Sequence, residues 1–123
     1  MFIYLACGAV ITSPQGTIYS TNWPRPYPIS TECAWVITTS QSEYITLHFL
    51  LFDMETSVNC VNDYLAIYDD THVHAKLLAK FCGTTVPMPF LIPTNKARIV
   101  FSSNANVTGR GFIIGYNTGN GHQ

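Results

Sequence analysis

Most of the acidic side chains of this 123-residue chain lie in one short segment. Five of its seven Asp and Glu residues fall within residues 53–70, on both sides of Cys60, and they are Asp53, Glu55, Asp63, Asp69 and Asp70. Crowded carboxylates repel one another, and each favours its charged form when a positive charge is close. Calcium takes about six to eight oxygen ligands, many of them carboxylates. The segment therefore predicts a cation, either a metal ion or a Lys or Arg of a partner.

Two other chemistries fit the sequence less well. His72 and His74 form an H-x-H pair that could hold zinc, but no third ligand has a suitable spacing, so exposed loop histidines are the better interpretation. Glu55 and Asp63 could be posed as the acid/base pair of a glycosidase. However, the chain is small for a sugar cleft and has no G-x-S-x-G, H-E-x-x-H or glycine-rich phosphate-binding motif. We expect no enzymatic activity.

The four cysteines predict two disulfides. They are Cys7, Cys33, Cys60 and Cys82, and no two of them form a C-x-x-C pair of the kind found in zinc and redox sites. The sequence alone leaves three pairings open. Disulfides persist in oxidising compartments, which indicates an extracellular location. The sequon Asn106-Val-Thr108 makes Asn106 a candidate glycosylation site and agrees with that location.

The composition is that of one folded domain. Hydrophobic residues make up 47% of the chain and charged residues 11%, unlike disordered proteins. A chain of this length buries roughly two-thirds of the surface that it exposes when unfolded. The formal net charge is −1 and the six Lys and Arg residues are scattered along the sequence, so we expect neither nucleic acid nor an anionic membrane as the main partner.

The two ends of the chain are interpreted as flanking segments. The apolar run at residues 1–11 could pass for the core of a signal peptide, but no Lys or Arg precedes it, and cleavage after Ala9 would remove Cys7. We therefore take residues 1–6 as an N-terminal extension, 7–117 as the domain and 118–123 as a C-terminal linker. A lipid anchor on Cys7 is a weaker alternative. No other apolar run approaches the roughly 20 residues that a membrane-spanning helix needs, so we expect no direct membrane insertion.

Apolar residues alternate with a period of two over most of the chain, which predicts half-buried β-strands. Ile45, Leu47, Phe49 and Leu51, for example, share one face. Many short strands separated by turns favour an antiparallel sandwich. The predicted strands span residues 17–20, 33–37, 45–51, 64–68, 97–102 and 111–116.

Two segments need separate treatment. Residues 74–81 carry helix formers, but so short a segment sustains little helix alone, and we predict a strand at 77–81. Residues 22–28 contain three prolines and predict an extended loop with Trp23 and Tyr27 exposed, where they could pack down or anchor a contact. The aromatic residues expected in the core are Trp35, Phe49 and Phe101.

Seven short motifs follow one another in an order and spacing that resemble the CUB domain family, from about residue 7 to residue 116. They are residues 16–28, 33–37, 52–55, 60–63, 67–69, 81–83 and 111–116. The resemblance implies an all-β, jelly-roll-like sandwich of two antiparallel sheets with disulfides Cys7–Cys33 and Cys60–Cys82. It also implies a non-enzymatic extracellular interaction module, as found in complement-type and tolloid-like proteases, neuropilins, cubilin-like receptors and spermadhesins.

Many members of that family hold calcium with a Glu, an Asp eight residues later and a second Asp before the last strand. The matching positions here are Glu55, Asp63 and Asn104, and the resemblance implies that Tyr27 supports one of the acidic ligands by a hydrogen bond. Asn104 departs from the pattern, since a neutral amide can ligate calcium but brings no charge. We expect calcium to bind with lowered affinity, and a glycan on Asn106 would lie two residues from this site.

The resemblance also implies a partner. In calcium-holding relatives the acidic ligands accept a Lys or Arg of another protein, which here makes Tyr27, Glu55 and Asp63 the partner-binding residues. Such contacts give steering and specificity more than affinity. The alternatives are a calcium-free, spermadhesin-like domain that binds carbohydrate or protein through other surfaces, and a structural spacer between domains.

The remaining acidic residues are assigned smaller parts. Asp53 is expected to support the site structurally at most. Asp69 and Asp70 are expected to form a turn at a strand end. For Glu55 and Asp63 themselves, a solvated acidic turn is the alternative interpretation.

Overall fold

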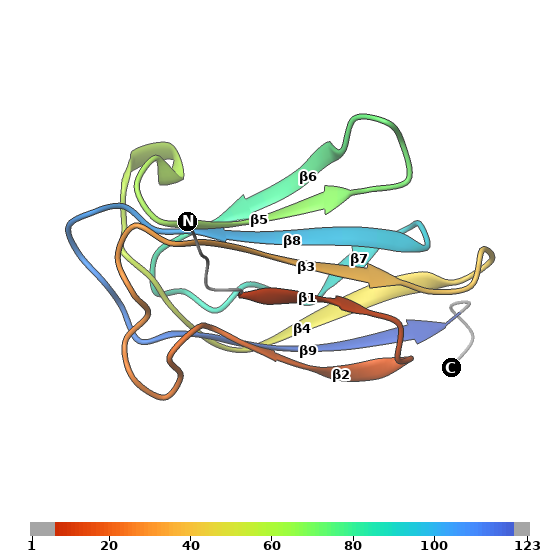
Figure 1. Cartoon of the computed structure of the whole chain (residues 1–123), viewed down its shortest axis with the longest axis horizontal. Coiled ribbons are helices and arrows are strands. Elements are labelled where there is room, and N and C mark those ends of the chain that lie inside the picture. The colour runs from red at the N-terminus through yellow and green to blue at the C-terminus, as the bar shows by residue number, and fades with distance from the viewer. Residues whose placement is uncertain (1–6, 120–123) are drawn as a thin grey trace, which may run out of the picture.

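The computed structural model describes residues 7–119. Within them, nine strands form two sheets that pack into a sandwich (Figure 1), which confirms the expected all-β fold. One sheet has the order β1-β3-β8-β5-β6 and the other the order β2-β9-β4-β7. The elements are β1 (Gly8–Ile11), β2 (Gln15–Tyr19), β3 (Glu32–Thr38), β4 (Tyr44–Asp53), the 3-10 turn η1 (Val58–Cys60), β5 (Tyr64–Asp69), β6 (Lys76–Phe81), β7 (Phe90–Ile92), β8 (Lys96–Ser102) and β9 (Gly111–Gly119).

One strand pair departs from the expected antiparallel arrangement. β1 runs parallel to β3, whereas the other pairs of the described residues are antiparallel. The chain between β1 and β3 passes through β2 in the other sheet, and a crossover of this kind is what a parallel pair requires. Both expected disulfides are confirmed: Cys7–Cys33 joins the starts of these two strands, and Cys60–Cys82 joins η1 to the end of β6.

Every predicted strand is present, and two short ones were not predicted. Residues 76–81 form β6 in spite of their helix formers, because pairing with β5 outweighs local propensity. The missed strands are β1 and β7, both short strands at sheet edges. Their few residues give too little alternation to recognise. No helix among residues 7–119 has the length and apolarity needed to span a bilayer.

The last strand is longer than predicted. β9 continues through Thr118 and Gly119, which pair with Ile45 and Tyr44 of β4, and the Thr118 N–H also donates to the Pro14 carbonyl at 2.9 Å. β9 therefore reaches two residues into the segment predicted as linker. The proposed extension at residues 1–6 and the rest of the linker, residues 120–123, lie outside the described part of the chain.

A β-bulge in β4 changes which residues face the core. Its register shifts between Phe49 and Leu51, so the inward positions change from odd to even numbers, and Phe52 is buried in place of the half-buried Leu51. The prediction that Leu51 continues the inward face was therefore wrong. Without the bulge, Asp53 at the end of β4 would share the parity of Phe49 and be directed toward the core.

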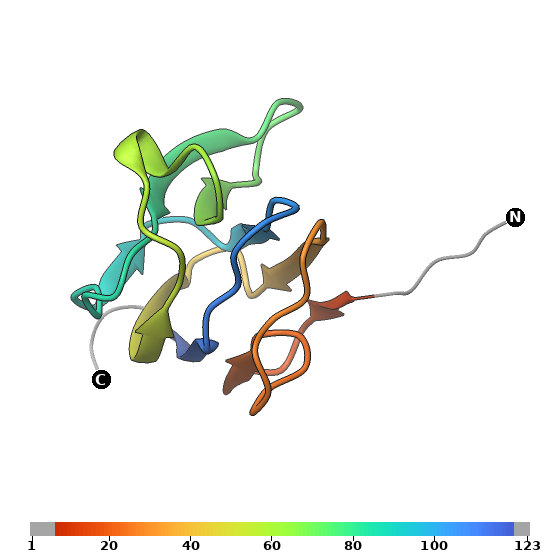
Figure 2. The same ribbon diagram turned by 90° about the vertical axis from the view of Figure 1, so that its left-hand side faces the viewer.

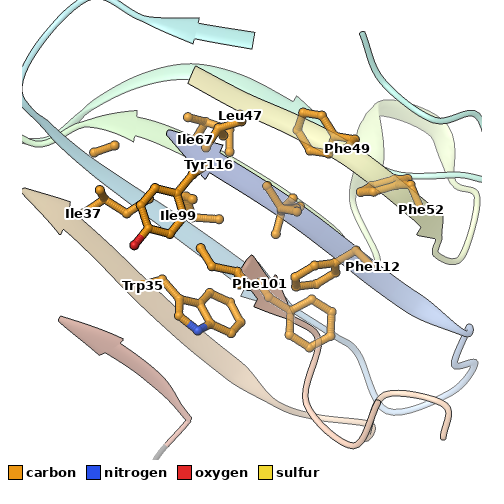
Figure 3. Close-up of a cluster of buried hydrophobic side chains, with 14 of the residues drawn as sticks. Trp35, Ile37, Leu47, Phe49, Phe52, Ile67, Ile99, Phe101, Phe112 and Tyr116 are labelled. Carbon is orange, nitrogen blue, oxygen red and sulfur yellow. The ribbon is translucent and has the colours of Figure 1, made fainter. Parts of the chain in front are cut away.

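Aromatic rings fill the space between the two sheets (Figure 3). Trp35 and Phe112 pack edge to face with ring centroids 5.9 Å apart, and Phe101 lies 5.7 Å from Phe112. Edge-to-face pairs stabilise a core beyond the area that they bury. The three expected core aromatics are confirmed, with Trp35 and Phe49 each 7% exposed and Phe101 0% exposed.

Asp69 ties two turns together at one end of the sandwich. Its Oδ1 accepts hydrogen bonds from the N–H and hydroxyl of Thr71, at 2.9 and 2.6 Å, and from the Thr94 hydroxyl at 3.2 Å. The Thr71 hydroxyl makes the largest contribution to a lowered pKa of the Asp69 carboxyl, while burial opposes it. Asp69 thus has the expected turn role, whereas Asp70 forms an ion pair with Arg98 at 3.2 Å.

Asp69→Asn is expected to lower the free energy of unfolding by about 1 kcal/mol at neutral pH, because a neutral amide accepts these hydrogen bonds less strongly than a carboxylate. A lowered pKa contributes stability that is complete above the unfolded value, about 3.9, and is lost as pH falls through the folded pKa. The difference between variant and wild type, measured by urea unfolding, should therefore shrink below about pH 4. A difference that stayed constant down to about pH 2 would contradict the ionised role of Asp69.

Candidate functional site

Three loops meet at one end of the sandwich, which faces the viewer in Figure 2. They connect β2 to β3, β4 to β5 and β8 to β9. The β2–β3 loop carries Tyr27, the β4–β5 loop carries Glu55 and Asp63, and the β8–β9 loop carries Asn104. The fold thus brings the four residues assigned from the sequence to the same end of the molecule.

Tyr27 connects the hydrophobic core to this end. Its ring packs edge to face on Phe101, with centroids 5.0 Å apart, and its N–H donates to the Gly109 carbonyl at 3.1 Å. The hydroxyl donates to Asp63 Oδ2 at 2.5 Å and accepts from the Glu55 N–H at 3.1 Å. Burial, and secondly the bond to Asp63, raise the pKa of Tyr27 well above its ordinary value, so the hydroxyl stays a donor.

The expectation that Tyr27 is exposed was wrong. The side chain is 1% exposed, because the loop folds back and places the ring on the core. Trp23, on the same loop, is half-buried. Neither the three prolines nor the loop length indicates this orientation, since it depends on Phe101, which lies 74 positions later in the sequence.

Asp63 is a fully buried carboxylate, with 0% of the residue exposed. Its Oδ1 accepts the Asn104 N–H at 2.7 Å, while Oδ2 accepts the Tyr27 hydroxyl. Both donors are uncharged, and among residues 7–119 Asp63 forms no ion pair. A buried charge is costly unless it is well paired, so two neutral hydrogen bonds leave the group attractive to a cation.

Glu55 has one oxygen without a partner. Oε2 accepts a hydrogen bond from Asn62 Nδ2 at 3.2 Å, but Oε1 is buried and has no hydrogen-bond partner within the described residues. A buried, unsatisfied acceptor costs about 1–3 kcal/mol, and more when it is charged. The orphaned oxygen therefore marks a position where a cation or a donor would stabilise the protein.

Asn104 closes the site from the third loop. Its backbone carbonyl accepts the Ser30 N–H at 2.8 Å, and its side-chain Oδ1 accepts the Asn106 N–H at 3.2 Å. An amide oxygen has a second lone pair, so Oδ1 can still ligate. The candidate glycosylation residue Asn106 is exposed and is joined to Asn104 by this hydrogen bond.

The other sequence-predicted groups lie apart from this network or support it. Asp53 Oδ2 accepts the Arg110 N–H at 3.4 Å, which places it as a support between the β4–β5 and β8–β9 loops. His72 and His74 are exposed in the β5–β6 loop. Among residues 7–119, no three His, Cys, Asp or Glu side chains converge on one point that could hold a metal ion. The candidate cation site has two carboxylates and one amide.

Sequence reasoning missed residues that hold the loops in place. Asn62 bridges the β4–β5 loop, since its N–H donates to Ser57 Oγ at 3.2 Å and its side chain donates to Glu55. Ser103 donates from its hydroxyl to the Pro28 carbonyl at 2.7 Å and fastens the β8–β9 loop to the β2–β3 loop. Asn62 directly precedes Asp63 in a recognised motif, but small polar residues of this kind are common in turns and carry little signal.

Comparison with known proteins identifies the same family that the sequence motifs resemble. The model of the family described as CUB domain matches residues 7–116. Tolloid-like protein 1 of Mus musculus is 38% identical over 112 residues, which is 91% of this chain and 11% of that protein. The chain therefore spans about a tenth of the length of that relative.

Two solved structures are also similar. The CUB1-EGF-CUB2 domain of human MASP-1/3 superposes with a TM-score of 0.83 at 31% identity, covering 94% of this chain and 43% of that one. A crystal structure described as the MASP-1 CUB2 domain bound to Ca2+ has a TM-score of 0.79 at 32% identity, covering 91% of this chain and 99% of that one.

Tyr27→Phe should lower the free energy of unfolding by about 1–3 kcal/mol in calcium-free buffer, because it leaves Asp63 Oδ2 and the Glu55 N–H without partners but keeps the ring on Phe101. Urea unfolding measures the change. The matched control is Tyr19→Phe, whose residue is 51% exposed and whose loss should stay within about 0.5 kcal/mol. Equal effects of the two substitutions would show that the Tyr27 hydroxyl does not hold the site.

Proposed function

The chain belongs to the CUB domain family, and on that premise we propose that it is an extracellular protein-interaction module whose loop end binds calcium and a basic side chain of a partner protein. The observation that carries the proposal is Glu55 Oε1, a buried carboxylate oxygen without a partner in the described residues. It lies at the same end as the buried carboxylate of Asp63, which forms no ion pair among residues 7–119. No catalytic step is proposed.

The oxygen donors fit calcium. Glu55 offers the free Oε1, Asp63 offers the remaining lone pair on each oxygen, and Asn104 offers Oδ1; carbonyls and waters complete the coordination that calcium takes. The two carboxylates balance the two positive charges that calcium supplies when bound. A related domain of 32% identity has been crystallised with Ca2+, which supports the same chemistry here.

The chain's own residues prepare the site before an ion arrives. Tyr27 and Asn104 orient both oxygens of Asp63, and Asn62 orients Glu55 through Oε2. The two bonds to Asp63 join the β4–β5 loop to the β2–β3 and β8–β9 loops. An ion that joins Glu55, Asp63 and Asn104 would therefore reinforce contacts that already exist and would stiffen the loop end.

The burial of the site changes the roles that we assign to its residues. Asp63 is 0% and Tyr27 1% exposed, so neither side chain can form an exposed contact with a partner in this structure. Of the three residues only Glu55 keeps appreciable exposed surface, because the residue is half-buried although its Oε1 is buried, so it is the acidic group that a partner's amine can approach. We therefore assign the direct contact to Glu55, and the holding of the ion and the loop to Asp63 and Tyr27.

The wider setting follows from the same premise. Two disulfides suit an oxidising, extracellular compartment, and the exposed sequon at Asn106 suits a glycoprotein. A contact through one basic residue is weak for a single domain. Because the chain spans about a tenth of its tolloid-like relative, we propose that useful affinity comes from several such modules acting together.

Calcium is expected to raise the melting temperature of the wild-type domain relative to a chelator. A ligand at about 100 times its Kd adds about 2.7 kcal/mol to the folded state. Glu55→Gln should abolish the shift, because it removes the charge on the unpartnered oxygen. Glu43→Gln, in the β3–β4 connection at the other end of the sandwich, should keep it. An unchanged wild-type melt at millimolar calcium would refute the calcium site.

Asn104→Asp is expected to tighten calcium binding by about tenfold, because a third carboxylate replaces a neutral amide in the ligand set. Isothermal titration calorimetry of unglycosylated protein measures the Kd. Asn106→Asp adds the same charge two residues away and should have a smaller effect, which separates ligation from long-range attraction. A Kd that is unchanged or weaker in Asn104→Asp would remove Asn104 from the ligand set.

A further inference from the structure

A shallow groove lies on the four-stranded sheet, within its strands rather than in the loops. Its volume is about 340 Å³, and it is lined by Gln15, Gly16 and Thr17 of β2, His48 of β4, and Gly115 and Tyr116 of β9. β9 lies between β2 and β4 in this sheet (Figure 1). The strand register places Gly115 opposite Thr17 on one side and opposite His48 on the other. The three residues are therefore direct neighbours on one surface.

Gly115 forms the floor of this groove and faces outward. Its neighbours in β9, Ile114 and Tyr116, are 0% and 5% exposed and belong to the core. Successive residues of a strand point to opposite faces, so Gly115 lies on the outer face. A Cβ atom added to Gly115 would meet no atom closer than 3.9 Å, and the nearest ones are the His48 carbonyl oxygen and Leu50 Cδ1. The space above this glycine is open.

Folding gives no reason for a glycine at position 115. Gly83 and Gly111 have positive φ angles of 88° and 107°, and a Cβ atom at Gly16 would lie 2.9 Å from the ring of Tyr116. Gly115 has neither a positive φ nor an atom close to its Cβ position. Glycine inside a strand weakens the strand and often marks a place where a ligand approaches the backbone closely. The open floor is therefore a feature of binding rather than of packing.

The side chains around the floor are hydrogen-bonding groups without Asp, Glu, Lys or Arg among them. Thr17 and His48 flank Gly115, and the next outward row consists of Gln15, Asn117 and Thr46. A hydrogen bond joins His48 Nε2 and Asn117 Oδ1 at 3.0 Å. Hydroxyl, amide and imidazole groups can each donate and accept hydrogen bonds. They match a ligand whose own groups do both, which is the chemistry of neutral hydroxyls.

An apolar row borders the polar ones on the same face. Ile113 pairs with Tyr19 on one side and with Leu51 on the other. Tyr19 is 51% exposed, and Leu50, at the bulge beside them, is 64% exposed. Small-ligand sites commonly combine apolar surface with a few hydrogen-bonding groups. A sugar ring presents apolar C–H faces and a rim of hydroxyls, so it can contact both kinds of row at once.

A peptide strand cannot bind this face through backbone pairing. β9 already pairs with β2 on one side and with β4 on the other, so its N–H and C=O groups are used within the sheet. Strand addition needs an unpaired sheet edge. Recognition on this face must come from side chains, and the neutral donors and acceptors here favour a hydroxyl-rich ligand.

We propose that the outer face of the four-stranded sheet binds a neutral saccharide, whose ring lies over Gly115 while its hydroxyls meet Thr17 and His48. A volume of about 340 Å³ is near the lower end of the roughly 300–1,000 Å³ of ligand pockets, which indicates a small ligand. The site shares no residue with the candidate cation site. It therefore goes beyond the proposed function and stands independently of it.

NMR titration of the domain with methyl α-mannoside, methyl β-galactoside and methyl β-N-acetylglucosaminide tests this site. At least one of these glycosides should bind with a Kd on the order of 1–10 mM, as suits a small ligand in a shallow groove. It should shift the backbone amides of Thr17, His48 and Gly115. The Kd should be the same in calcium and in chelator, because the groove is built from strand residues.

Gly115→Val should weaken this binding by at least about tenfold, because the new side chain occupies the floor of the groove. Its melting temperature should stay the same or rise, since the position has room for Cβ and valine favours strands. The matched control is Ala9→Val, which adds a branched side chain at an exposed position of β1 in the other sheet and should leave the Kd unchanged. His48→Leu should weaken binding by about three- to tenfold, the size of one lost hydrogen bond.

Each contrary outcome overturns a stated part of the proposal. If none of the three glycosides shifts the groove amides at about 50 mM, far above the expected Kd, there is no saccharide site. Unchanged binding in both Gly115→Val and His48→Leu would place the ligand elsewhere. Tighter binding of a sulfated heparin disaccharide would show a site for anions rather than for neutral sugars. Tighter binding of N-acetyltryptophanamide in the groove would assign it to an aromatic side chain of a partner protein instead.

Discussion

The buried carboxylate of Asp63 is the group on which the loop end of this sandwich depends. A carboxylate that has no exposed surface must be satisfied by donors from the protein, and both of its donors come from other loops. Tyr27 reaches it from the β2–β3 loop and Asn104 from the β8–β9 loop. One side chain therefore connects three loops. Because a buried carboxylate without hydrogen-bond donors would be costly, each loop is held in the position that supplies or carries those bonds.

The rest of the fold supplies the conditions for that arrangement. The Tyr27 ring rests on Phe101 in the aromatic core, so the hydroxyl is aimed by the packing of the two sheets. The bulge in β4 reverses the inward parity just before the acidic segment. The Cys60–Cys82 disulfide then pins η1 to the end of β6. Core packing, strand register and a covalent link thus act on the same few residues.

Hydrogen bonds within the chain hold the loop end together but leave its charges incompletely balanced. Neutral donors satisfy Asp63 and one oxygen of Glu55, whereas the second Glu55 oxygen has no partner in the described residues. The proposed calcium ion and the proposed basic partner group would answer the same deficit, because each would bring positive charge to two carboxylates that form no ion pair among residues 7–119. Under the proposed function, this shared requirement would let one set of residues serve both the ion and the partner. Because Asn104 is a neutral amide, the candidate cation site has two carboxylates rather than three.

The sequence by itself determined features that depend on neighbouring residues or on residue counts. The period-two alternation predicted the long strands, the even number of separated cysteines predicted two disulfides, and the clustered carboxylates with the family motifs led to Glu55, Asp63, Asn104 and Tyr27. The tertiary structure alone decided the parallel β1–β3 pair, the place of the bulge, the burial of Tyr27 and Asp63, and the unpartnered oxygen of Glu55. The reason is that burial and hydrogen bonding depend on residues far apart in the chain. Tyr27 and Asp63 are separated by 36 positions in the sequence, and Asp63 and Asn104 by 41. No local sequence pattern predicts which groups so far apart will come into contact.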